Sequence, residues 1–152
     1  MKKLLGILVL GLLLSSNVYG RDNPALKGIV GFSLSIPFQG EVCDINKQRI
    51  ETAVKYIFAN SKIKIGAGYP EYIEISANVL ESRTYCAGNV GIQVFSFSTI
   101  KNSAGNPYFG THEMYTSDHI SVASPDKFPN VFINHLEENL KSFIVEWAES
   151  NK

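Results

Sequence analysis

Cysteine is scarce in this 152-residue chain, where Cys43 and Cys86 are the only two. They form no Cys-x-x-Cys motif, and the acidic residue nearest to Cys86 in sequence, Glu81, adds only one further ligand, so a metal site built on the cysteines is disfavoured. Asn-x-Ser/Thr acceptor sequences are also absent, which is compatible with a bacterial source. No cysteine lies near the end of the N-terminal apolar run, which excludes a lipid-modified start there.

The chain has no excess of positive charge, because 14 lysines and arginines face 14 aspartates and glutamates. Nucleic-acid binding needs a basic surface that neutralises phosphates. The composition therefore argues against nucleic acid as the main partner, and anionic lipid is disfavoured for the same reason.

Long apolar runs are limited to the N-terminus. Two lysines follow the first methionine, and residues Leu4 to Leu14 are all Leu, Ile, Val or Gly. This run is well short of the roughly 20 residues that a helix needs to cross a bilayer, which disfavours the alternative of an uncleaved anchor. Val18 and Gly20 at the −3 and −1 positions complete a secretory signal peptide over residues 1–20.

Cleavage before Arg21 would leave 152 − 20 = 132 residues, which suits one domain over 21–152. Two lysines leave with the signal peptide, so the mature formal charge is 12 − 14 = −2. We found no repeat, low-complexity tract or domain linker. The sequence thus predicts a periplasmic or secreted protein with no stable membrane insertion after signal cleavage.

Two cysteines in an exported chain most simply form one disulfide. A Cys43–Cys86 bridge would join residues 86 − 43 = 43 positions apart. The chain-entropy relation gives a stabilisation of about 4 kcal/mol for such a loop. Two free thiols and a metal pair are the alternatives.

Apolar periodicity predicts an α+β fold. Alternation with a period of two predicts four strands, over residues 26–38, 71–82, 87–100 and 108–122. Stripes with helical spacing predict helices over 44–60, capped by Asp44, and over 130–149. The apolar face changes between Val94 and Phe95, which suggests a bulge or burial on both faces.

The order strand, helix, three strands, helix is most simply satisfied by a four-stranded, mainly antiparallel sheet with both amphipathic helices on one face. Residues 102–107 form the clearest loop, and they would join the last two strands as a hairpin. The last strand is the most polar of the four and is a candidate for the sheet edge.

The nearest approach to a catalytic cluster lies between His112 and Ser121. His112 and Met114 would share one face of a strand, which is a copper-type pair with too few ligands for a site. Asp118 and His119, beside Ser117 or Ser121, supply the residue types of a hydrolase, but adjacent strand residues point apart. We therefore predict no metal or cofactor site and assign no catalytic residue.

Four features carry a resemblance to small exported bacterial proteins of uncharacterised function: Cys43 before a helix, Ser61-Lys62-Ile63-Lys64 after it, Cys86 opening a strand, and Phe143-Ile144-Val145-Glu146-Trp147 near the end. The resemblance covers about residues 43–147 and implies no activity. The layout is also similar to sheet-plus-two-helix accessory lipoproteins of the bacterial envelope, from which this chain departs by lacking a lipid-attachment cysteine.

Three hypotheses of function follow. The first is a non-enzymatic binding or accessory protein of the bacterial envelope, whose partner is a protein or an envelope component. The second is a small secreted hydrolase that uses His112 or His119. The third is a secreted inhibitor of another enzyme, which would act through a loop such as Asn102–Pro107.

Overall fold

The computed structural model describes residues 23–38 and 42–152, so the predicted signal peptide over 1–20 lies outside the described residues. It confirms an α+β fold. The described elements, in chain order, are the 3₁₀ turn η1 (Pro24–Leu26), β1 (Gly31–Ser35), α2 (Lys47–Ala59), β2 (Lys64–Ile65), β3 (Glu71–Glu81), β4 (Cys86–Lys101), β5 (Pro107–Ala123) and α3 (Phe128–Ser150).

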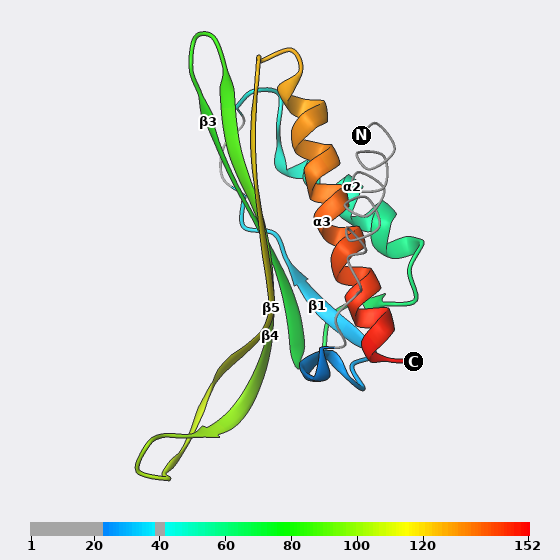
Figure 1. The fold of residues 1–152 in the computed structure, drawn as a ribbon, viewed down its shortest axis with the longest axis vertical. Coiled ribbons are helices and arrows are strands. Elements are labelled where there is room, and N and C mark those ends of the chain that lie inside the picture. The colour runs from blue at the N-terminus through cyan, green and yellow to red at the C-terminus, as the bar shows by residue number, and fades with distance from the viewer. Residues whose placement is uncertain (1–22, 39–41) are drawn as a thin grey trace, which may run out of the picture.

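Both helices lie on the same side of one sheet, as predicted (Figure 1). Neither helix, nor any other in the described part of the chain, is long and apolar enough to cross a membrane.

The predicted four-stranded, mainly antiparallel sheet was wrong in strand number and in the direction of its first pairings. The sheet has five strands in the order β2-β1-β3-β4-β5. β1 pairs in parallel with β2 and with β3, whereas β3, β4 and β5 pair antiparallel. The parallel pairings follow from the helix between β1 and the later strands, because a helical crossover brings the chain back to the end from which it started. The alternating stretch Lys62-Ile63-Lys64-Ile65 predicts only a short extension, and residues 64–65 of it form the edge strand β2.

The first predicted strand and the first helix cap also need correction. β1 starts only at Gly31, because the Asn23 side chain caps η1 and Gly28 has a positive φ of 81°. Asp44 is not the helix cap: it lies in a turn with φ of 56°. Asn46 caps α2 instead, and its side-chain oxygen accepts a hydrogen bond from the Arg49 backbone N–H at 2.9 Å.

β4 and β5 extend well beyond the rest of the sheet. The last β3–β4 pair is Glu71 with Ser96, so residues 97–101 and 107–111 pair only with each other and form what we call the arm (Figure 1). The predicted bulge is confirmed by a register shift at Val94/Phe95, and β5 is an edge strand, as predicted.

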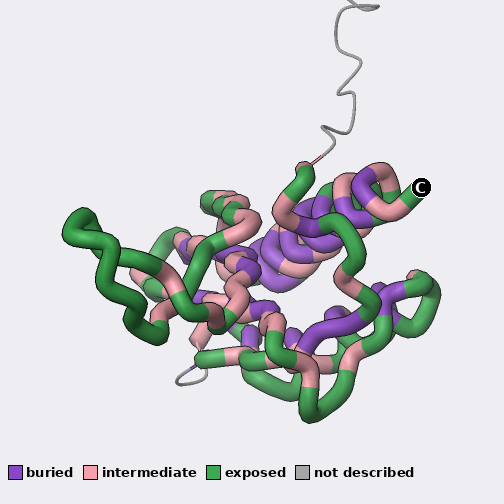
Figure 2. The backbone as a smooth tube through the Cα atoms, turned by 90° about the horizontal axis from the view of Figure 1, so that it is seen from below, coloured by how far each residue is buried: buried purple, intermediate pink, exposed green. Residues whose placement is uncertain are grey.

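The core lies between the sheet and the two helices, and α3 contributes the largest share of the helical residues in it. The buried residues of α3 include Phe132, Leu136, Leu140 and Phe143. Figure 2 shows that buried segments gather along this helix and that the projecting loops are exposed. A Cβ at Gly88 would lie 2.9 Å from the rings of both Phe128 and Phe132, so a residue without a side chain lets the start of α3 lie close to β4.

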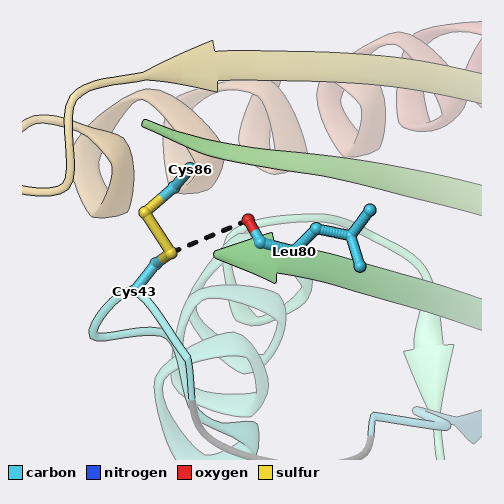
Figure 3. Close-up of a disulfide and its surroundings, with 3 residues drawn as sticks. All are labelled: Cys43, Leu80 and Cys86. Carbon is cyan, nitrogen blue, oxygen red and sulfur yellow. Dashed lines mark hydrogen bonds between the residues drawn. A yellow bond between two sulfur atoms is a disulfide. The ribbon is translucent and has the colours of Figure 1, made fainter. Parts of the chain in front are cut away.

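The predicted disulfide joins Cys43 to Cys86 with a Cα–Cα distance of 6.3 Å (Figure 3). It ties the turn before α2 to the first residue of β4. The Cys43 sulfur also lies 3.9 Å from the Leu80 carbonyl oxygen of β3. Because a disulfide sulfur carries no proton, we treat this approach as a packing contact.

Candidate functional site

The side of β3, β4 and β5 that faces away from α2 and α3, here called the open face, is covered by neither of these helices (Figure 1). Paired residues on neighbouring strands share a face, and successive residues alternate between faces. Ile75 of β3 pairs with Ile92 of β4, and both are fully buried on the helix side. Their neighbours in sequence therefore point to the open face.

Four aromatic side chains form a continuous row at one end of the open face. Tyr72 of β3 stacks on Phe95 and on Phe97 of β4, with ring centroids 5.2 and 5.3 Å apart. Phe97 stacks in turn on Phe109 of β5 at 6.0 Å. Phe97 is 43% exposed and Phe109 72% exposed. We call Tyr72, Phe95, Phe97 and Phe109 the aromatic row; it begins on the sheet and continues onto the arm.

The other end of the open face is aliphatic. Leu80, Ile120 and Val122 belong to it by strand alternation, and they are 75%, 73% and 62% exposed. Scattered apolar residues are normal on protein surfaces, but several on one sheet face are typical of interaction sites.

Polar groups occupy the middle of the open face. The Gln93 side chain donates a hydrogen bond to the Glu113 carboxylate at 3.2 Å, and Asn89 donates one to Asp118 at 3.5 Å. Asp118 folds over Gly91, where an added Cβ would lie 2.5 Å from the Asp118 Oδ1. Glycine at 91 therefore leaves room for this carboxylate on the open face.

The opposite side of β5 contains a second polar cluster, buried against α3. The Ser121 Oγ and the His135 Nδ1 lie 2.7 Å apart, and the rings of His119 and His135 lie against each other with centroids 4.0 Å apart. Ser117 donates a hydrogen bond to Asn139, which donates one to the carbonyl of Val90. These contacts dock α3 onto the edge strand.

Ser121 and His135 have the residue types of a nucleophile and its base, but a substrate cannot reach the serine hydroxyl. Ser121 is only 1% exposed. Within the described residues, no carboxylate forms a hydrogen bond to the imidazole, as a third catalytic member would. The pair is therefore better explained as a buried polar contact.

The residues singled out from the sequence separate in the structure. Asp118 lies on the open face and His119 on the helix side, as strand alternation predicted. His112 is exposed on β5, whereas Met114, at the bulge, packs against the core. No three His, Cys, Asp or Glu side chains form a metal-binding group among residues 23–38 and 42–152. The two cysteines serve the disulfide.

Two features were missed from the sequence. His135 has a detectable signal, because it is three residues after Phe132 and so lies at the border of the buried stripe of α3. The aromatic row could be found only with the strand register, since Tyr72 and Phe109 are far apart in the chain.

On the helix side of β5, Tyr115 is the group whose pKa is clearly shifted by its surroundings. Its ring packs edge-on against Phe143 at 5.1 Å. Burial is the main cause that raises the pKa of the Tyr115 phenol above its ordinary 10.0; a hydrogen bond with Ser117 lowers it, and the Glu146 carboxylate adds to the rise. The phenol is therefore neutral at physiological pH.

Comparison with protein-family models gave no match, and comparison with curated proteins found no similar sequence.

Proposed function

We propose that this chain is an exported, non-enzymatic binding or accessory protein of the bacterial envelope, and that it holds its partner on the open face. The observation that carries the proposal is the aromatic row, which leaves Phe97 and Phe109 exposed on a face that neither α2 nor α3 covers. Aromatic side chains are enriched at protein interfaces because they bury a large apolar area with little loss of conformational freedom.

Two further observations support export to the periplasm or the medium. The disulfide fits an oxidising compartment, since cytosolic proteins seldom keep such bonds. The N-terminal segment fits a signal peptide by its sequence.

The hydrolase alternative has less support. It was expected to use His112 or His119, but the serine–histidine hydrogen bond found among the described residues joins Ser121 to His135, and this serine hydroxyl is enclosed between β5 and α3. A nucleophile has to reach its substrate, so a catalytic role would require α3 to move away from the sheet.

Affinity capture from envelope extracts with the chain that starts at Arg21 tests the proposal. A variant with Phe97→Ser and Phe109→Ser should lose the captured partner. The matched control is Tyr56→Ser with Val145→Ser, which removes two exposed apolar residues from the groove between α2 and α3 and should leave capture unchanged. Equal capture by all three proteins would contradict the open-face proposal.

A specific observation also favours the inhibitor hypothesis. The turn at the tip of the arm is organised by its own hydrogen bonds: the Asn102 side chain accepts from the N–H groups of Ala104 and Asn106 at 3.0 and 2.9 Å. A turn held in one conformation loses little entropy on binding, as inhibitory loops require. Replacing residues 102–106 with a short Asn-Gly turn should abolish capture under this hypothesis and preserve it under the first.

A further inference from the structure

We infer that the partner of the open face is a protein that presents a segment rich in lysine and arginine. This inference rests on the proposed function and specifies the chemistry of its partner. The observation behind it is that the carboxylates and aromatic rings of β3, β4 and β5 share one face, while the basic residues lie at its margins.

The strand register shows which carboxylates lie on the open face. Glu74 is next to buried Ile73 and Ile75 and points to the open face, and Glu113 pairs with Phe95 of the aromatic row. Asp118 pairs with Gly91 and lies over it. The central open face therefore has three carboxylates.

Basic residues near this face are peripheral. Lys64 is in the edge strand β2, Arg83 is in the turn between β3 and β4, and Lys101 is at the far end of the arm; all three are exposed. No lysine or arginine occurs within β3, within β5 or in β4 before Lys101. Gln93 and Asn89, which donate hydrogen bonds to Glu113 and Asp118, are neutral amides and add no positive charge to this face.

Carboxylates beside aromatic rings recognise lysine and arginine in two ways. The carboxylates accept charge-assisted hydrogen bonds, bidentate ones from arginine. The faces of phenylalanine and tyrosine rings attract the same cations through the ring quadrupole. The aliphatic parts of the cationic side chains can cover Phe97 and Phe109 at the same time. An acidic partner, or a phosphate-bearing one, would meet repulsion instead.

Panning a random dodecapeptide library, displayed on phage, against the chain that starts at Arg21 tests this inference. The test variant is Glu74→Gln, Glu113→Gln, Asp118→Asn, which keeps the side-chain shapes and removes the charge. The matched control makes the same change in net charge on the helices, with Glu51→Gln, Glu138→Gln and Glu149→Gln. The affinities of the selected peptides are measured by fluorescence anisotropy at low and high salt.

We expect the selected peptides to be enriched in lysine and arginine. They should bind the open-face charge variant at least about tenfold more weakly than the wild type and bind the helix control with unchanged affinity. Their affinity for the wild type should fall at high salt. Selected peptides without basic enrichment that still need Phe97 and Phe109 would overturn this inference and leave the proposed function intact. Peptides that bind the charge variant and the Phe97→Ser, Phe109→Ser variant as well as the wild type would also overturn it, as would a failure to select any peptide. The capture experiment then tests the proposed function separately.

Discussion

Removal of the Cys43–Cys86 disulfide is the perturbation whose effect the structure allows us to work out most fully. The bridge closes a loop with a sequence separation of 43. The chain-entropy relation then gives a stabilisation of about 4 kcal/mol at 25 °C. Cys86 is fully buried, so a serine there would add the cost of burying a hydroxyl, and alanine is the cleaner replacement.

The backbone conformation at position 43 makes a second contribution to the stability of these variants. Cys43 and Asp44 have φ values of 53° and 56°, and the Ile45 N–H donates to the Val42 carbonyl at 3.0 Å, so both residues occupy the left-handed region of a tight turn. A non-glycine residue in that region costs about 1–2 kcal/mol. Cys43→Gly with Cys86→Ala should therefore be more stable than Cys43→Ala with Cys86→Ala by about 1 kcal/mol.

Urea unfolding under non-reducing conditions measures both the stabilisation by the disulfide and the effect of the residue at position 43. The only tryptophan, Trp147, is 9% exposed and donates a hydrogen bond to the Ile29 carbonyl, so its fluorescence reports on the packing of α3. With an m-value of about 2 kcal/mol per molar urea, the double-alanine variant should unfold at a midpoint about 2 M lower than the wild type. Superimposable melts, or two titratable thiols in the native wild type, would refute the tether. Equal midpoints for the glycine and alanine variants would refute the turn argument.

Three further predictions concern export, the buried polar cluster and alkaline pH. Intact mass of the protein from the periplasm or medium should correspond to a chain that starts at Arg21; retention of residues 1–20 in a membrane fraction would contradict this. His135→Ala should lower the free energy of unfolding by about 1–3 kcal/mol, because the buried Ser121 hydroxyl loses its partner, and adding Ser121→Ala should recover part of the loss; no recovery in urea melts would count against the hydrogen bond. Because burial raises the pKa of Tyr115 in the folded state, its contribution to stability should be complete below pH 10 and be lost as pH rises through the folded value. Tyr115→Phe should flatten that alkaline decline, and an unchanged pH profile would speak against it.

Local patterns predicted most of the elements. The alternation in residues 71–82, 87–100 and 108–122 corresponds to β3, β4 and β5 within a residue or two, and the stripe in residues 130–149 lies within α3. The change of face at Val94/Phe95 located the bulge. These signals are reliable because each depends on residues close together in the chain.

Predictions were wrong where the local sequence was compatible with more than one structure. Asp44 and Asn46 are both good helix caps, and the turn that places Cys43 for its disulfide leaves the cap to Asn46. The alternation from Leu26 suggested one long strand, but the Asn23 cap and the turn at Gly28 use the first residues for η1. The alternation in residues 62–65 was too short to predict that β2, with only two residues, joins the sheet.

The sequence by itself determined the α+β class, the disulfide partners and the residues of the buried stripes, because periodicity and cysteine number leave few alternatives. Only the tertiary structure decided the parallel pairing of β1, the contact of Ser121 with His135 and the joining of Tyr72, Phe95, Phe97 and Phe109 into one row. The physical reason is that each of these features depends on strand register or helix placement, which bring together residues that are distant in the chain.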